Sequence, residues 1–240
     1  MNKIVLVHGA WLGAWCWKGV ASELRKAGRE VVVPELPGHG DDQTPLEKIS
    51  LDAYVDTVAA ALGDHAAKSI VVGHSMAGIV LSFLAERLPA RIEKLIYVSA
   101  YLLQDGENIT QVSMAATDSL VGPNMVPAAD WSTIGIKPDG LKEVFAADAP
   151  DAVIAELRKR ARPEPSGPFN APVSVTPARF GSVSRFYIKT LNDRAVTPAL
   201  QDAMLAKTPC DRVVSLSTSH TPFFANPVGL TAKIIDLSNS

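Results

Sequence analysis

The chain has 240 residues, of which 47% are hydrophobic and 20% are charged, an ordinary composition for a globular protein. Its formal net charge is −2, and both signs of charge are spread along the sequence, so we expect no nucleic-acid partner. The first apolar run is too short for a signal peptide, and no stretch is long enough to span a membrane. Cys16 and Cys210 fit neither a metal site nor a disulfide framework. These features predict a cytoplasmic protein that does not bind a membrane.

Short apolar runs alternate with amphipathic stretches over the first hundred residues. Between the runs, apolar residues at helical spacing predict three helices, the first of which runs from Trp17 to a stop at Gly28. The alternation predicts a parallel sheet with crossover helices on both faces. The predicted strands cover residues 4–7, 31–33, 70–72 and 94–99, and the other two helices cover 51–62 and the stretch from just after Ser75 to about 88.

The alternation lapses after Tyr101. From about residue 104 to 182 the sequence has scattered helical pieces and a proline-rich segment, which holds too many prolines between 163 and 177 for regular structure. A disordered linker would account for the prolines, but Trp131, Phe145 and Phe169 give this stretch apolar surface to bury. We therefore expect a small helical cap inserted over the sheet.

Regular patterns resume after the predicted cap. They predict a strand at 185–191, a helix at 198–206, a strand at 212–216 and a last helix from about Pro227. We expect one α/β domain over residues 1–240, with a core of about 1–103 and 183–240 and a cap of about 104–182.

The most informative stretch is residues 69–83, where a β-branched run ends at Gly73 and helix-compatible sequence starts directly after Ser75. This pattern is typical of a nucleophile elbow, a strained strand–turn–helix that lifts a serine Oγ above the end of a sheet. Small residues at Gly73, Ala77 and Gly78 suit the crowded turn, although glycine is more usual at position 77. A glycine–serine turn between a strand and a core helix is the alternative, but the flanking elements favour Ser75 as a nucleophile.

A serine nucleophile needs a base, and the base needs an acid that orients it. Functional groups collect beyond the carboxyl ends of parallel strands. There His220 follows the predicted strand 212–216, and Asp193 follows 185–191. Asp105, shortly after the strand 94–99, is an alternative acid.

The other histidines have simpler explanations as polar groups. His8, His39 and His74 lie in predicted turns, and His65 lies near a predicted helix end. An oxyanion hole needs two backbone N–H donors. The elbow supplies Met76 N–H, and the loop after the first strand supplies Ala10 N–H, unless that loop is only a glycine turn packed on the next helix.

The chain resembles the α/β-hydrolase superfamily and, within it, the group of plant methylesterases, hydroxynitrile lyases and small bacterial esterases. The resemblance extends over nearly the whole chain and rests on VLVHGAW near the N-terminus, WCW at 15–17, VGHSMAG around Ser75 and SHTPFFANP around His220. It implies a six-stranded parallel core, a small helical cap and a Ser75, Asp193 and His220 triad. The spacing of Asp193 ahead of His220 agrees with this group and favours Asp193 over Asp105.

Two positions depart from the lyases of this group. A lysine follows the catalytic histidine of those lyases, whereas this chain has Thr221. A hydroxyl residue follows their first-strand histidine, whereas this chain has Gly9. Both differences favour ester hydrolysis.

We therefore expect a serine carboxylic ester hydrolase, free of cofactor and metal, that acts through an acyl-enzyme on a small apolar or aromatic ester. Leu12, Met114, Trp131 and Phe145 are candidate pocket residues, although apolar cap side chains more often serve as core. A hydroxynitrile lyase or C–C bond hydrolase with the same triad is an alternative. A ligand receptor with this fold and little turnover is another. The oligomeric state stays open, with a homodimer as one option.

Overall fold

The computed structural model describes residues 2–63 and 67–240, so His65 lies outside the described residues. Within these ranges the main sheet has six strands in the order β2-β1-β3-β4-β8-β9, and each neighbouring pair is parallel. This arrangement confirms the α/β fold that the sequence predicts. The strands are β1 (Ile4–Val7), β2 (Val31–Val32), β3 (Ser69–His74), β4 (Ile92–Val98), β8 (Ser184–Thr190) and β9 (Arg212–Leu216).

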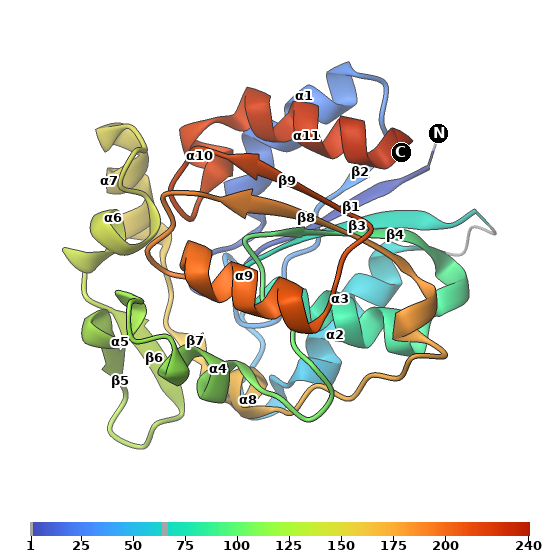
Figure 1. The fold of residues 1–240 in the computed structure, drawn as a ribbon. Coiled ribbons are helices and arrows are strands. Elements are labelled where there is room, and N and C mark those ends of the chain that lie inside the picture. Colours follow the sequence, from blue (N-terminus) through green and yellow to red (C-terminus); the bar gives the residue numbers. More distant parts are fainter. Residues whose placement is uncertain (1, 64–66) are drawn as a thin grey trace.

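Helices cover both faces of this sheet (Figure 1). One face carries α1 (Lys18–Lys26) and α11 (Pro227–Asn239). The other carries α2 (Leu51–Ala61), α3 (Ala77–Arg87) and α9 (Pro198–Lys207). Because both faces are covered, β1 and β3 are buried at every position, as is typical of central parallel strands. The further short helical segments are η1 (Ala14–Trp17), η2 (Leu46–Lys48), η3 (Pro89–Arg91), η4 (Phe180–Ser182) and α10 (Pro222–Ala225).

The chain between β4 and β8 contains the predicted cap, which we call the insertion (residues 104–182). Its three strands form a small antiparallel sheet in the order β5-β6-β7. The insertion thus contains the predicted helices and, in addition, a small sheet that the sequence analysis did not predict. The prolines also do not exclude regular structure, since β7 and α8 lie among them. The elements are α4 (Ile109–Ala115), α5 (Val121–Asn124), β5 (Met125–Pro127), β6 (Thr133–Ile136), α6 (Gly140–Phe145), α7 (Asp151–Arg160), β7 (Glu164–Pro165) and α8 (Ser166–Asn170).

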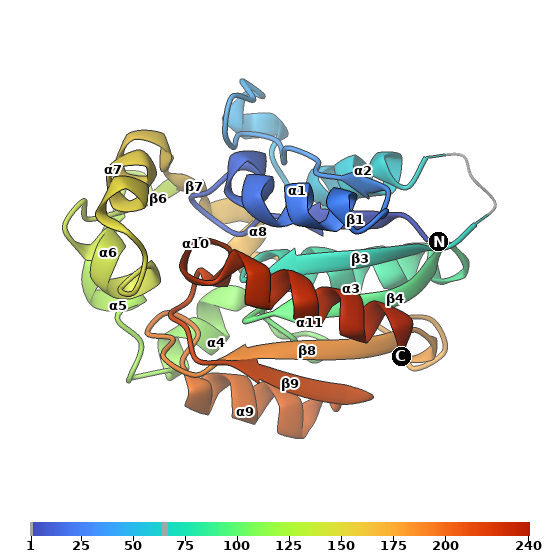
Figure 2. The same ribbon diagram turned by 90° about the horizontal axis from the view of Figure 1, so that it is seen from above.

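The insertion lies beyond the carboxyl ends of the parallel strands in both views (Figures 1 and 2). The register pairs Val7 with Gly73 and Gly73 with Tyr97, so β1, β3 and β4 end at the same edge of the sheet. The loops that leave this edge therefore face the insertion. Among the described residues, no helix is long and apolar enough to cross a membrane.

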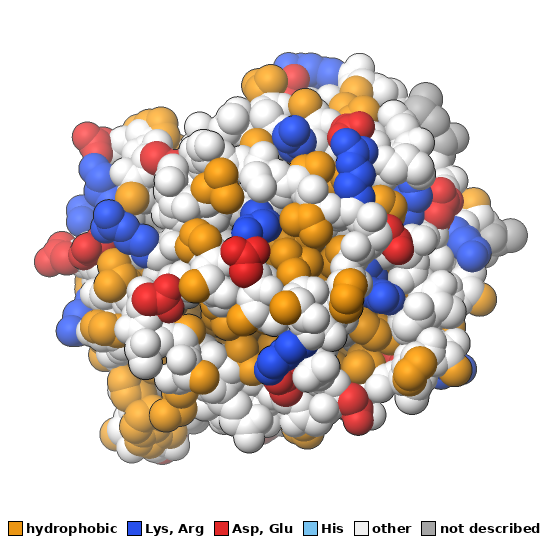
Figure 3. Space-filling view, viewed as in Figure 1, with side chains coloured by type: hydrophobic (Ala, Val, Ile, Leu, Met, Phe, Trp, Pro, Cys, Tyr) orange, Lys and Arg blue, Asp and Glu red, His pale blue; other side chains and the backbone are white. Residues whose placement is uncertain are grey.

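Charged side chains of both signs are mixed on the face drawn in Figure 3. Hydrophobic side chains gather on the same face over the end of the insertion that carries β5 and β6. Two exposed apolar residues come from this part of the chain, Val126 and Trp131.

Candidate active site

Ser75 occupies the turn between β3 and α3. Its φ of 55° lies in the left-handed region, which non-glycine residues rarely adopt. The backbone closes tightly around this turn. A Cβ at Gly73 would lie 2.5 Å from Leu81 Cδ1, and one at Gly78 would lie 2.1 Å from the Tyr101 carbonyl oxygen. The small residues beside Ser75 thus let the strand, the turn and the helix pack together.

His220 and Asp193 form a buried pair beyond the ends of β9 and β8. His220 Nδ1 lies 2.7 Å from Asp193 Oδ2, and both side chains are nearly inaccessible. The same carboxylate accepts from Thr190 Oγ1 at 2.7 Å and from the N–H groups of Ala195 and Val196 at 2.8 and 3.0 Å. A carboxylate in this setting only accepts, so His220 Nδ1 carries the hydrogen, and in the neutral ring Nε2 is the nitrogen that can accept a proton.

The alternative acid, Asp105, lies elsewhere. Its Oδ1 accepts a hydrogen bond from Val175 N–H at 3.0 Å, on an exposed part of the insertion. The structure therefore pairs His220 with Asp193. Ser75 and His220 line one small cavity together with Leu12. The Ser75 hydroxyl makes no hydrogen bond within the described ranges, and the bond between nucleophile and base is often long before substrate binds.

Two backbone N–H groups flank Ser75. Met76 is the N-cap of α3, and its N–H is one of the donors that a helix leaves unpaired at its start. Ala10 follows Gly9, where a Cβ would lie 2.9 Å from Ser75 Cβ. In the part of the chain that the structure describes, neither the Ala10 nor the Met76 N–H has an acceptor. The two donors are thus free to bind an oxyanion beside Ser75.

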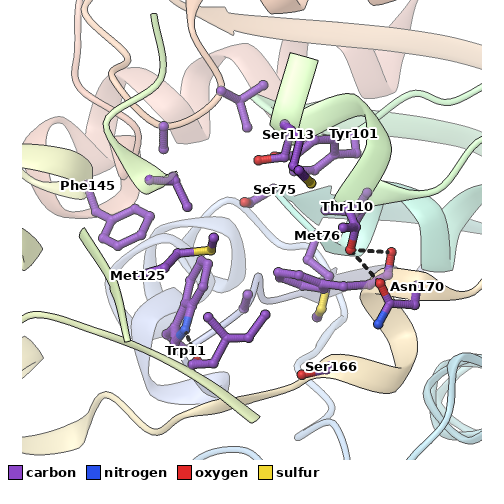
Figure 4. A pocket seen from close by; sticks show the side chains of 18 of the residues that line it. Trp11, Ser75, Met76, Tyr101, Thr110, Ser113, Met125, Phe145, Ser166 and Asn170 are labelled. Atoms are coloured by element: carbon purple, nitrogen blue, oxygen red, sulfur yellow. Dashed lines mark hydrogen bonds between the residues drawn. The ribbon is translucent and has the colours of Figure 1, made fainter. Parts of the chain in front are cut away.

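A cavity of about 230 Å³ opens next to Ser75, Ala10 and Met76 (Figure 4). Its wall comes mainly from apolar side chains of the insertion, and none of the described lining residues is charged. The polar groups include Ser113 and the hydrogen-bonded Thr110 and Asn170, whose oxygens lie 2.7 Å apart. Such a cavity suits a neutral, largely apolar ligand.

Three of the four predicted pocket residues line this cavity: Met114, Trp131 and Phe145. Phe145 is buried, but Met114 and Trp131 are 76% and 64% exposed, so these two are not core residues. Leu12 lines the smaller cavity that holds Ser75 and His220.

His74 supports the backbone of His220. The two rings lie 4.5 Å apart between centroids, and His74 Nε2 donates to the His220 carbonyl at 2.8 Å. Burial lowers the pKa of His74 well below its ordinary value, and the neighbouring His220 lowers it further. His74 is therefore neutral, with its hydrogen on Nε2.

Two acidic residues of the insertion, Glu164 and Asp148, were not anticipated from the sequence. Asp148 accepts from Ser219 N–H at 2.8 Å, directly before His220. Glu164 is fully buried and contacts His39, a residue expected only in a turn. The flanking prolines of Glu164 carry no signal of burial, and only the fold brings residues 39 and 164 together.

The profile of the Alpha/beta hydrolase family matches residues 4–234. The chain belongs to this family. Within the α/β-hydrolase family, a putative chloroplastic methylesterase 14 from Arabidopsis thaliana is 31% identical over 252 residues, which cover 99% of this chain and 72% of the relative. A pyrethroid hydrolase from Sphingobium wenxiniae is 28% identical, covering 100% of this chain and 89% of the relative. This chain spans 56% to 72% of the putative chloroplastic methylesterases that it matches.

Solved structures give the same answer for the fold of this α/β hydrolase. A pyrethroid hydrolase from Sphingobium faniae superposes with a TM-score of 0.89 at 27% identity, covering 100% of this chain and 98% of that one. A methylesterase from Arabidopsis has a TM-score of 0.85 at 25% identity, with coverage of 100% and 99%.

Proposed function

We propose that this α/β hydrolase is a serine carboxylic ester hydrolase with Ser75 as nucleophile, His220 as base and Asp193 as the acid that orients the base. The observation that carries the proposal is the 2.7 Å contact between His220 Nδ1 and Asp193 Oδ2, together with the small cavity that both His220 and Ser75 line. The methylesterases and pyrethroid hydrolases among its relatives support ester hydrolysis.

The reaction runs in two halves. Ser75 Oγ forms a bond to the ester carbonyl carbon while His220 Nε2 takes its proton. The N–H groups of Ala10 and Met76 bind the oxyanion. When the tetrahedral intermediate collapses, the bond to the alkoxy group breaks and His220 returns the proton to the departing alcohol. Water then attacks the acyl-enzyme with the same assistance, releasing the acid and free Ser75.

The cavity supports a neutral ester with apolar acyl or alcohol groups as substrate. Burying an apolar group is favourable by about 25 cal/mol per Å², whereas a free carboxylate would lose its hydration there with no cationic partner among the described lining residues. The cytoplasmic location stays a prediction, and so do the boundaries of the cap, while a homodimer stays one option for the open oligomeric state.

Two features of this chain favour hydrolysis over a lyase reaction. The residue after His220 is Thr221, whose hydroxyl donates to the Phe145 carbonyl at 2.8 Å and brings no positive charge to the site. Gly9 leaves no room for a hydroxyl side chain, because its Cβ would crowd His74 Nδ1 at 2.8 Å and Ser75 Cβ.

The test is hydrolysis of p-nitrophenyl acetate and a series of aryl and methyl esters, with Ser75→Ala as control. We expect turnover that Ser75→Ala abolishes, and a covalent fluorophosphonate adduct on Ser75 by mass spectrometry. Release of cyanide from mandelonitrile without esterase activity would instead support a lyase. Tight ligand binding without turnover, retained in Ser75→Ala, would support a receptor.

A further inference from the structure

The residue after the proposed oxyanion donor Ala10 has a strained backbone. Trp11 has φ 60°, a left-handed conformation that glycine adopts easily but that is unfavourable for a residue with a Cβ. Such strain persists where surrounding contacts hold it. The conformation matters because the Trp11 N–H and the Ala10 carbonyl belong to one peptide unit. This unit is joined through the Ala10 Cα to the unit that carries the Ala10 N–H, so contacts that hold Trp11 also restrain the Ala10 backbone.

The contacts that hold Trp11 come from the insertion. Trp11 N–H donates to Glu164 Oε2 at 3.3 Å, and the Trp11 carbonyl accepts from Arg162 N–H at 3.1 Å. The indole Nε1–H donates to the Ile134 carbonyl at 2.7 Å, a bond drawn in Figure 4. Of these three, only the bond to Glu164 is made by an insertion side chain.

The Glu164 carboxylate is held in place on its other sides by the core. Tyr54 OH donates to Oε1 at 3.1 Å, and His39 Nε2 lies 2.6 Å from Oε2. All three side chains are fully buried. His39 Nδ1 lies 3.0 Å from the Pro37 carbonyl, which can only accept, so Nδ1 carries a hydrogen.

The hydrogen bonds show how this pair is charged. Glu164 accepts from Trp11 N–H through Oε2 and from Tyr54 OH through Oε1, as a carboxylate with two acceptor oxygens does. Nε2 of His39 then also carries a hydrogen, and the pair is an imidazolium with a carboxylate. The negative charge of the Glu164 carboxylate makes Oε2 an acceptor for the Trp11 N–H.

We propose that Glu164 is a positioning residue of the oxyanion hole: it holds the Trp11 backbone in its left-handed conformation and so aims the Ala10 N–H at the reacting oxygen. This inference rests on the proposed function. The oxyanion hole of this protein is then completed by the insertion, although both of its donors belong to the core.

Glu164→Gln tests this role with almost no change in volume. Without the negative charge His39 becomes neutral, with its hydrogen on Nδ1 and a lone pair on Nε2. The lone pair draws the glutamine NH₂ to the former place of Oε2, where it meets Trp11 N–H donor to donor. The bond that holds Trp11 is lost while the side chain stays in its site.

The measurement is kcat and KM with p-nitrophenyl acetate, expressed per Ser75 titrated by fluorophosphonate so that only folded enzyme counts. A displacement of about 1 Å at a catalytic donor lowers the rate about 100-fold, and we expect a fall in kcat of this order in Glu164→Gln. We expect KM to stay within about threefold, because the lost interaction is made only in the transition state.

A pair of inhibitors separates positioning from general damage. Benzyl trifluoromethyl ketone adds Ser75 Oγ to its carbonyl, His220 takes the proton, and the resulting oxyanion occupies the hole. Benzyl methyl ketone binds mainly as a ground-state ligand. The inhibition constant of the trifluoromethyl ketone should rise in proportion to the loss of kcat/KM, and that of the methyl ketone should stay nearly constant.

Tyr54→Phe is the matched control. It removes a donor to the same buried carboxylate but leaves Oε2 and its bond to Trp11 N–H in place, so kcat should fall far less than in Glu164→Gln. If Glu164→Gln does not fold, Glu164→Asp replaces it, since the shorter side chain keeps the charge but withdraws the acceptor from Trp11. A folded Glu164 variant with wild-type kcat, or one that weakens both inhibitors equally, would overturn the role of Glu164. A wild-type protein without esterase activity would instead overturn the proposed function.

Discussion

Replacing Asp193 by asparagine should move the hydrogen of the neutral His220 ring from Nδ1 to Nε2. Asp193 Oδ1 accepts from the N–H groups of Ala195 and Val196 at 2.8 and 3.0 Å, so the asparagine carbonyl must take that place. The NH₂ group is left at the position of Oδ2, facing His220 Nδ1. It donates to Nδ1, and the ring hydrogen moves to Nε2. His220 then cannot accept the proton of Ser75.

The expected loss follows from this wrong tautomer. A correctly placed imidazole in the wrong tautomer lowers kcat about 10⁴-fold, or about 5 kcal/mol of transition-state stabilisation. KM should change little, because the Asp193 carboxylate faces the core and not the apolar cavity. The fold should survive, since Thr190 can turn its hydroxyl to accept from the new NH₂ group.

The assay is steady-state hydrolysis of p-nitrophenyl acetate, with thermal melting to establish that each variant is folded. Asp105→Asn is the matched control, because Asp105 is the other acid suggested by the sequence and its carboxylate bonds Val175 instead. It should retain kcat within about twofold, as expected for an exposed polar change. An Asp193→Asn enzyme with more than about a tenth of wild-type kcat would refute the tautomer argument.

Three further outcomes follow from the packing around the site. Burial alone would lower the pKa of His39, but the Glu164 carboxylate outweighs burial and raises that pKa above its ordinary value. The His39–Glu164 pair therefore contributes its full stabilisation of the fold below about pH 6.5, and this stabilisation is lost as the pH rises through the raised pKa of His39. Burial lowers the pKa values of His8 and His74, so these two residues add stability as the pH rises from about 6 to 7 in both the wild type and His39→Gln. In urea unfolding between about pH 6 and pH 9, the difference in unfolding free energy between the wild type and His39→Gln should therefore shrink as the pH rises. Gly78→Ala places a Cβ 2.1 Å from the Tyr101 carbonyl oxygen and should cost about 2–3 kcal/mol, seen as a fall in Tm of about 5–10 °C; an unchanged Tm would contradict the close packing. Trp131→Ala, at a ring that lines the cavity yet is 64% exposed, should raise KM for bulky aryl esters about tenfold and leave p-nitrophenyl acetate hydrolysis nearly unchanged; equal effects on both substrates would argue against a pocket role.

The parallel sheet could be predicted because its strands are short, apolar and followed by turn residues. The run at 4–7 coincides with β1, and 212–216 coincides with β9, whereas β4 begins two residues before the predicted 94–99. The two missed residues are Ile92 and Glu93, and the charged Glu93 interrupts the apolar pattern at the start of that strand. The nucleophile elbow was recognisable because its sterics demand small residues at fixed positions.

The small sheet of the insertion could not be predicted in the same way. The strands β5, β6 and β7 have 3, 4 and 2 residues, too few to show an alternating pattern. Pro127 and Pro165 occupy their ends, where a proline removes no essential ladder bond. The partners of Glu164 at positions 39 and 54 are more than 100 residues away, and single-sequence patterns contain no information about such contacts.

The insertion does more than shape the pocket, because it also contacts the two core loops that carry the proposed oxyanion donor Ala10 and the proposed base His220. On one side, Arg162 N–H, Glu164 and the Ile134 carbonyl bind Trp11, next to the Ala10 donor. On the other side, the Phe145 carbonyl and Asp148 bind Ser219 and Thr221, which enclose His220 in the chain. Substrate shape and catalytic geometry are therefore coupled through one segment. An insertion exchanged for that of another α/β hydrolase should lower kcat as well as change specificity, unless the exchanged segment carries acceptors for Trp11 N–H and Ser219 N–H at the same places.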